Sequence, residues 1–194
     1  MNLQELSFDN FLSLPKSVQD EVLNDYELIK VMLRKNISEH RYLHSISVAK
    51  TCEELAKRHN VDVKKAYLAG LLHDCCKFRD ESKLIEYMQK YEKDKLGSNV
   101  GIYHSWVAPY YLREKLDFKD EEILNAIYNH TILNSDDKLS LILYIADKRE
   151  PLRNINDGIL QKANSDLFGA YQLLKKDVED YINTKNERLI KNSI

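Results

Sequence analysis

The chain has 194 residues, which is enough for one domain with its own hydrophobic core, so neither disulfides nor a structural metal is needed to fold it. Its 29 basic and 31 acidic side chains nearly cancel, which argues against a general nucleic-acid coat protein but is compatible with a local basic pocket. Five glycines and three prolines are too few for the turns of a β-sandwich or barrel, and they spell no glycine-rich phosphate loop. We therefore expect an all-α protein and exclude P-loop and Rossmann enzymes.

Membrane and secretion signals are not expected from this sequence. No apolar run approaches the ~18–20 residues that a membrane span requires. Residues 1–10 lack the basic, apolar and small-residue series of a signal peptide. The three cysteines are odd in number and two are adjacent, which is not the pattern of a secreted disulfide framework. We expect a cytoplasmic protein in which Cys75 and Cys76 are buried as small hydrophobic side chains.

Helical periodicity runs through the first part of the chain. A first long helix is predicted with one apolar face, made by Val22, Tyr26, Ile29 and Leu33. Ser38 can cap a second helix that runs to about His59. Asp62 can cap a third helix, from Val63 to about Cys76, which is apolar nearly all round and so belongs at the centre of the fold. A second helix can approach it closely at its small residues, Ala66, Ala69 and Gly70.

The second half of the chain is predicted to be helical as well. Four helices are expected here, over residues 81–95, 103–115, 121–130 and 138–150, with a loop at 97–101. Pro109 predicts a kink or a late start of its helix, Asp120 can cap the helix that follows, and Pro151 ends the fourth. A last helix is expected from about Ser165, and its buried side would carry Leu167, Tyr171, Leu174, Val178 and Tyr181.

No repeat, low-complexity stretch or obvious boundary divides the chain. We expect one main helical domain over residues 36–182. An N-terminal helical segment, residues 1–35, is expected to pack on it, and residues 183–194 are expected to form a polar tail.

His73 and Asp74 are adjacent in LAGLLHDCC, the most apolar segment of the protein. A buried aspartate costs several kcal/mol unless it is paired or bound to a cation. Two interpretations of this dipeptide stay open when it is taken alone. One is a metal site, and the other is a hydrogen-bonded core histidine beside an aspartate that caps the next turn.

Four more polar residues are predicted on inward faces of other helices: His44, His104, His130 and Asp147. Each follows the spacing of apolar neighbours, as Asp147 does in the run LSLILYIAD. Six polar groups that must all be satisfied in one core indicate a shared site. Imidazole and carboxylate ligands suit Fe, Mn, Zn, Co or Ni rather than Ca, and the lack of a thiolate pair argues against structural zinc.

The order H…HD…D resembles the HD-domain superfamily of metal-dependent phosphohydrolases. The closer similarity is to the YqeK family, bacterial HD proteins that act as symmetrical diadenosine tetraphosphate hydrolases. It is carried by the lone His104 and by four segments: RYLHSISVA (41–49), AGLLHDCCK (69–77), AIYNHT (126–131) and IADKREPLR (145–153). Order and spacing are preserved over roughly residues 35–180.

This resemblance implies an HD-type helical bundle with a dinuclear metal site that favours iron, Mn, Co, Ni and Zn being the alternatives. The six ligands would be His44, His73, Asp74, His104, His130 and Asp147, with Asp74 bridging the two ions. The chain departs from the usual family pattern at Ala108-Pro109, at residues 132–134 and at Lys148-Arg149. None of these departures removes a ligand.

The resemblance also implies the roles of further residues. His73, Asp74 and Lys77 are the expected catalytic group, and phosphate binding is expected from Arg41, Lys77, Thr131 and Arg153. Arginine suits phosphate because its planar fork makes two parallel hydrogen bonds. Solvated surface charge is the alternative interpretation for Lys77 and for both arginines.

The reaction expected from such a site is hydrolysis without a covalent enzyme intermediate. Two cations neutralise phosphoryl oxygens and lower the pKa of a water from ~15.7 toward 7. Attack at an inner phosphorus of diadenosine tetraphosphate then gives two ADP. The expected partner is this dinucleoside polyphosphate or another nucleotide, with neither nucleic acid nor membrane, and a homodimer is compatible with the sequence.

Two other functions stay open. An HD-type nucleoside mono- or triphosphate phosphatase would have the same metal core and a different pocket rim. A nucleotide- or iron-binding regulator would have the core without turnover, although its ligand set would then often be incomplete. A hemerythrin-like oxygen carrier is disfavoured because such proteins usually space carboxylates from histidine as H-x-x-x-[DE] on more than one helix.

Overall fold

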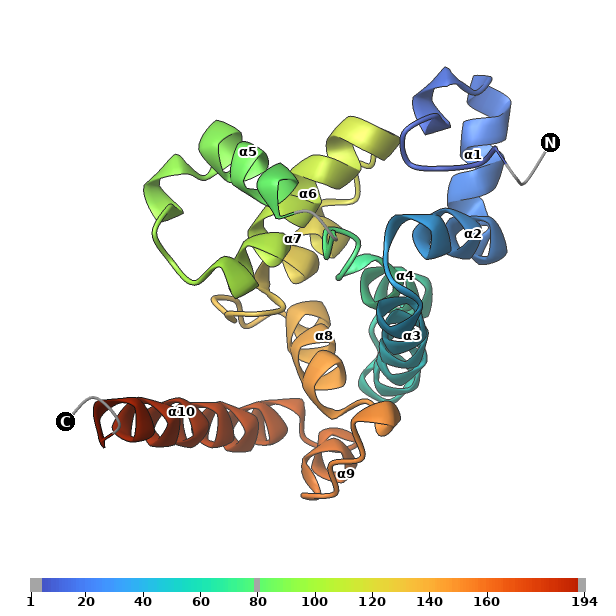
Figure 1. Ribbon diagram of the computed structural model, residues 1–194. Helices are drawn as coiled ribbons and strands as arrows, with labels where there is room; N and C mark the ends of the chain where they lie inside the picture. Colours follow the sequence, from blue (N-terminus) through green and yellow to red (C-terminus); the bar gives the residue numbers. More distant parts are fainter. Residues whose placement is uncertain (1–4, 79–80, 192–194) are drawn as a thin grey trace.

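The computed structural model describes residues 5–78 and 81–191, with side chains as far as residue 180. Helices and loops make up the described part, which contains no strand, so the predicted all-α class is confirmed (Figure 1). The α-helices are α1 (Lys16–Asn24), α2 (Tyr26–Asn36), α3 (Glu39–His59), α4 (Val63–Leu72), α5 (Ser82–Tyr91), α6 (Tyr103–Leu116), α7 (Glu121–Asn129), α8 (Lys138–Arg149), α9 (Ile159–Ala163) and α10 (Leu167–Lys191). Short 3-10 helices are η1 (Phe11–Ser13), η2 (Lys93–Lys95), η3 (Val100–Ile102) and η4 (Pro151–Arg153).

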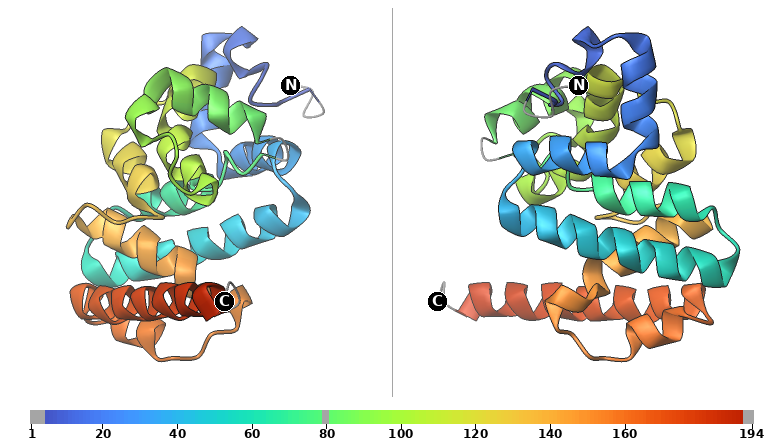
Figure 2. Two further views of the ribbon diagram at one scale, coloured as in Figure 1. Left: turned by 60° about the vertical axis from the view of Figure 1, so that its left-hand side comes forward. Right: turned by 90° about the vertical axis from the view of Figure 1, so that its right-hand side faces the viewer.

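Helix α4 lies at the centre of the fold, as its all-round apolar sequence predicted. Every residue from Ala66 to Leu72 is buried, and the helix contacts α3, α7 and α8. Helix α6 packs on α7, and α10 covers α8 and α9 at one end of the molecule (Figure 2). The described residues include no helix that is both long and apolar enough to cross a membrane.

Helices α3 and α4 touch at Gly70. A Cβ atom built on Gly70 would lie 2.7 Å from the Cα of Ala49 and 2.9 Å from its backbone nitrogen. Such distances are far inside van der Waals contact, so only glycine allows the two backbones this approach. The contact is one turn before His73 and one turn after His44, and it therefore sets how closely these two side chains meet.

Side-chain caps start the helices where the sequence predicted. Ser38, Asp62 and Asp120 accept hydrogen bonds from first-turn amides of α3, α4 and α7. Asp137 does the same for α8, where no cap is predicted. Because a cap determines where a helix begins, it also determines which of the later residues face the core.

The first long helix is in fact two helices, α1 and α2, and the prediction of one was wrong. The break is at Asp25, whose backbone is extended, with φ −116° and ψ 108°. Its carboxylate accepts the amide of Glu27 at 2.8 Å, so this aspartate acts as the cap of a new helix. The apolar face continues across the break, because Val22, Ile29 and Leu33 are all fully buried.

The third helix ends at Leu72, four residues before its predicted end. Nδ1 of His73 lies 2.7 Å from the carbonyl oxygen of Gly70, which in a continued helix would accept the amide of Asp74. Tighter bonds close the following turn, from the Cys75 amide to Leu72 and from the Lys77 amide to Asp74. The side chain of His73 thus replaces a helical hydrogen bond, and the turn that follows presents Asp74 to the core.

Three further differences lie later in the chain. Helix α6 begins at Tyr103, six residues before Pro109, so a late start at the proline was wrong. Helix α9 was not predicted; Gly158 precedes it with a positive φ of 76°. Helix α10 continues to Lys191 across most of the segment 183–194 expected as a tail, of which residues 192–194 lie outside the described part, as does the side chain of Tyr181.

The α3–α4 approach predicts a stability effect at Gly70. We expect Gly70→Ala to lower the free energy of unfolding by about 1–3 kcal/mol, because its methyl group meets the backbone of Ala49 and forces α3 and α4 apart. Urea unfolding followed by circular dichroism measures this difference. The matched control is Gly101→Ala, whose methyl group meets only the side chain of Asn99 and should change stability by less than about 0.5 kcal/mol. Equal stabilities of the two variants would contradict the prediction.

Candidate metal centre

The six residues predicted as metal ligands come from five places in the fold and meet in its interior. His44 is on α3, His73 and Asp74 form the turn after α4, His104 is in the first turn of α6, His130 follows α7, and Asp147 is near the end of α8. Five of the six side chains are no more than 7 % exposed, and that of Asp147 is 15 % exposed. Positions 103 residues apart in sequence are therefore in direct contact.

The carboxylate of Asp74 is at the middle of this cluster. Its Oδ2 lies 3.7 Å from Nε2 of His73 and 4.0 Å from Nε2 of His44. Its Oδ1 faces the other way, 3.2 Å from Nε2 of His104 and 3.7 Å from Nε2 of His130. One carboxylate thus divides the cluster into a first ligand group, with His44, His73 and Asp147, and a second ligand group, with His104 and His130.

The first ligand group is compact. Oδ1 of Asp147 lies 3.1 Å from Nε2 of His44 and 3.6 Å from Nε2 of His73. The ligand atoms of these three residues all lie within 4.8 Å of one another, and so do those of His73, Asp74 and His130. His73 therefore stands between the two groups. Such spacing allows several of these atoms to bind one ion.

The second ligand group is smaller. Nε2 of His104 lies 3.0 Å from Nε2 of His130, and the hydroxyl of Thr131 is 3.5 Å from the same His104 atom. Thr131, a predicted substrate-binding residue, is half-buried at the edge of the cluster. Among the described residues, Asp74 is the one that contributes a carboxylate on this side.

Hydrogen bonds behind the cluster orient three of its imidazole rings. Nδ1 of His73 donates to the carbonyl of Gly70 at 2.7 Å, and Nδ1 of His130 donates to that of Ile127 at 2.6 Å. Nδ1 of His44 lies 3.1 Å from Oε1 of Glu150. A proton held on Nδ1 leaves the lone pair of Nε2 free and directed inward, which is the arrangement that metal-binding histidines show.

Burial and charge determine the protonation of the cluster. Burial lowers the pKa of His104 and lowers that of His130 to about 4, so both rings are neutral at pH 7. Burial would also lower the pKa of His73, but the charges of Asp74 and Asp147 outweigh it and raise this pKa. Burial by itself would raise the pKa of Asp74 and of Asp147. Neighbouring cations and imidazoles outweigh it and hold each pKa well below its usual range.

These groups fit a divalent metal. The fully buried Nε2 of His73 has no hydrogen-bond partner, although it faces two ionised carboxylates. Such a nitrogen needs either a proton or a cation between itself and the oxygens. Neutral imidazoles with carboxylates are the ligands of divalent transition metals, whereas calcium and magnesium prefer oxygen alone.

The residues predicted to bind phosphate lie at the rim. Arg41 donates to Oδ2 of Asp74 at 3.1 Å, and Arg153 donates to Oδ1 of Asp147 at 3.1 Å. Both guanidinium side chains remain more than one third exposed. The ammonium of Lys77 donates to the carbonyl of Gly101 at 3.2 Å, and burial lowers its pKa. The arginines thus contact the cluster directly, and Lys77 does not.

Two further residues, Glu150 and Lys148, also contact the cluster. Glu150 is 2 % exposed and accepts from His44, as described. Lys148 donates to the carbonyl of His130 at 2.8 Å and to Oδ2 of Asp147 at 3.4 Å, so it links the two ligand groups. The position of Glu150 between an apolar helix and Pro151 was the available signal. Nothing in the pattern distinguished Lys148 from a surface lysine.

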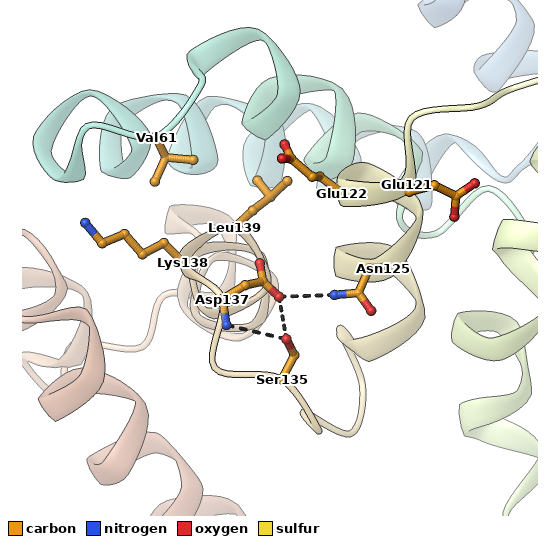
Figure 3. A pocket seen from close by; sticks show the side chains of 8 residues that line it. All are labelled: Val61, Glu121, Glu122, Asn125, Ser135, Asp137, Lys138 and Leu139. Atoms are coloured by element: carbon orange, nitrogen blue, oxygen red, sulfur yellow. Dashed lines mark hydrogen bonds between the residues drawn. The ribbon is translucent and has the colours of Figure 1, made fainter.

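A pocket of about 420 Å³ opens beside the first ligand group, and we call it the rim pocket. It is lined by His40, Arg41, Leu43 and His44 from α3 and by Glu150, Leu152 and Arg153 from the chain after α8. A second pocket, of about 470 Å³, lies near the N-terminal ends of α7 and α8 (Figure 3). Within it, Asn125 and Ser135 donate to the carboxylate of Asp137, and it contains none of the predicted site residues.

Comparisons with known proteins show which family the chain belongs to. Residues 41–152 match the HD domain family. The chain is 33% identical to "Bis(5'-nucleosyl)-tetraphosphatase, symmetrical" from Bacillus subtilis over 160 residues, which are 80% of this chain and 86% of that protein. It is also 33% identical to the protein of the same name from Halalkalibacterium halodurans over 144 residues, which are 72% of this chain and 77% of that protein.

A solved structure has the same fold. It is a predicted HD superfamily hydrolase, described as involved in NAD metabolism, from Clostridium acetobutylicum. The TM-score is 0.75 at 31% identity, and the match covers 84% of this chain and 89% of the other. With its HD motif in the turn after α4 and these relatives along most of its length, the chain belongs to the HD-domain family, in the branch of the symmetrical bis(5'-nucleosyl)-tetraphosphatases.

Proposed function

We propose that this protein hydrolyses diadenosine tetraphosphate symmetrically, to two molecules of ADP. The similarity to symmetrical tetraphosphatases over 80% of the chain carries the choice of substrate. The buried cluster around Asp74 supports the chemistry, because metal-dependent phosphohydrolases need several neutral imidazoles and ionised carboxylates at one point. We keep the cytoplasm as the expected location, since all three cysteines are buried and free.

The metal centre of this proposal is dinuclear and favours iron, with Mn, Co, Ni and Zn as alternatives. His44, His73 and Asp147 would hold one ion, His104 and His130 the other, and Asp74 would bridge them through its two oxygens. The opposite orientation of these oxygens toward the two ligand groups supports the bridging role. When bound, two such metal ions would neutralise phosphoryl oxygens and supply hydroxide at neutral pH.

The protein's own residues would hold the substrate and stabilise charge. Arg41 and Arg153 are placed to donate to phosphate oxygens, because both guanidinium groups reach the cluster and remain partly exposed. Lys77 and Thr131 would contribute from the opposite edge. Water attacks one of the two inner phosphorus atoms, the central P–O–P bridge breaks, and the leaving group is ADP. Arg41, Arg153 and Lys77 would stabilise the negative charge that develops on this ADP.

The first test identifies the products. We expect two ADP per diadenosine tetraphosphate, with heavy oxygen from labelled water in only one of them, because each turnover transfers one water oxygen. Chromatography with mass spectrometry measures both quantities. ATP plus AMP as main products would contradict symmetrical cleavage. Rapid turnover of a mononucleotide with none of the dinucleotide would favour the phosphatase alternative, and binding without any turnover would favour the regulator.

The second test concerns the bridge. We expect Asp74→Ala to lose both metal ions and all turnover, because its carboxylate faces both ligand groups. His104→Ala should keep one ion, since only the second ligand group loses a nitrogen. Elemental analysis of the purified variants measures the metal content. Asp136→Ala, an exposed acid in the loop before α8, is the control and should hold as much metal as the wild type. Two equivalents retained by Asp74→Ala would show that the residue does not bridge.

The third test separates phosphate binding from metal binding. We expect Arg153→Ala to lower kcat/KM by roughly 10- to 150-fold, the value of a lost charge-assisted hydrogen bond, while metal content stays unchanged. Arg113→Ala removes an equal charge from a surface pair with Glu121 and should leave kcat/KM unaltered. A loss of metal in step with activity would instead assign Arg153 to the support of Asp147.

A further inference from the structure

The rim pocket has two kinds of wall. At its inner end His44 belongs to the metal centre, with Nε2 3.1 Å from Oδ1 of Asp147. The guanidinium groups of Arg41 and Arg153 stand beside that end, each 3.1 Å from an aspartate of the cluster. A chain of phosphates that enters here therefore passes two arginines before it reaches Asp74 and Asp147.

The outer walls are apolar. Leu43 is 51% exposed and Leu152 is 60% exposed, and both line the same pocket. Single exposed leucines are common on protein surfaces and need no explanation. Two of them beside two arginines, at the entrance to a buried cluster, give the combination that a nucleotide needs, because a base has two apolar faces and its phosphates are anionic.

We propose that the rim pocket binds one nucleoside of the substrate, with its base against Leu43 and Leu152 and its phosphates along Arg41 and Arg153. The assignment rests on the proposed function in so far as the substrate is a nucleotide. It adds that this nucleoside lies on the side of the metal centre where the rim pocket opens. It also makes the two leucines determinants of nucleotide affinity.

The size of the pocket limits it to one nucleoside. Sites for small molecules enclose about 300–1,000 Å³, and the rim pocket, at about 420 Å³, is near the lower end of this range. The second nucleoside of a dinucleotide must then lie beyond the metal centre. Ile132 is also an exposed apolar side chain, 45% exposed and adjacent to Thr131, and it does not line the rim pocket. It therefore serves as the matched control for the position of the base.

The test compares a ligand that has a base with one that has none. Calorimetric titration of the manganese-loaded protein with ADP and with pyrophosphate gives the two affinities. We expect the double variant Leu43→Ala/Leu152→Ala to bind ADP about tenfold more weakly and to bind pyrophosphate as the wild type does. Ile132→Ala should bind both ligands normally. All three side chains are exposed, so thermal unfolding of the variants should match that of the wild type.

The possible results distinguish a failure of the pocket assignment from a failure of the proposed substrate. The proposal is overturned if the double variant binds ADP within twofold of the wild type, or if Ile132→Ala shows the loss instead. A selective loss of ADP affinity in the double variant supports the pocket even if the wild type fails to cleave diadenosine tetraphosphate. Normal cleavage of the dinucleotide by the double variant, with an unchanged KM, overturns the pocket while the proposed function stands.

Discussion

The buried carboxylate of Asp74 is the constraint on which the structure depends. It is 3 % exposed, and burial alone would raise its pKa, yet the charge of His73 and the close approach of the His104 and His130 imidazoles hold the pKa well below its usual range. An ionised group at this depth costs several kcal/mol unless other groups compensate it. Three helices and two turns bring their polar side chains to this one point, while most of the other residues that they bury are apolar.

Close backbone packing makes that convergence possible. Gly70 lets α4 approach α3 to the point where a single methyl group would collide with Ala49. The same residue supplies the carbonyl that orients His73, and this hydrogen bond also ends α4. One glycine thus serves the helix contact, the helix end and the direction of a ligand. Because these functions coincide within one turn, we expect the position of the HD pair to tolerate little change.

The centre and its rim differ in how firmly they are held. The imidazoles are buried, and three of them are oriented by backbone carbonyls or by Glu150, so their geometry follows from the packing of the helices. The rim residues Arg41, Arg153, Leu43 and Leu152 are instead partly or largely exposed. The buried imidazoles and carboxylates are the groups that this chain's membership in the HD family concerns, because phosphohydrolases of that family depend on divalent metals. The exposed rim residues are the ones that would select among nucleotides.

The sequence by itself determined the helical class, most helix starts and the six polar positions in the core, because caps and apolar periodicity are local signals. It could not show that Asp25 interrupts the first helix or that α4 ends at Leu72, since each end depends on a side chain taking over a backbone group. Only the tertiary structure decided that the two oxygens of Asp74 face different imidazoles, that Glu150 and Lys148 contact the cluster, and that Leu43 and Leu152 share one pocket with two arginines. The residues concerned lie up to 112 positions apart in sequence, as Arg41 and Arg153 do, and no local pattern specifies the distance or direction in which such residues meet.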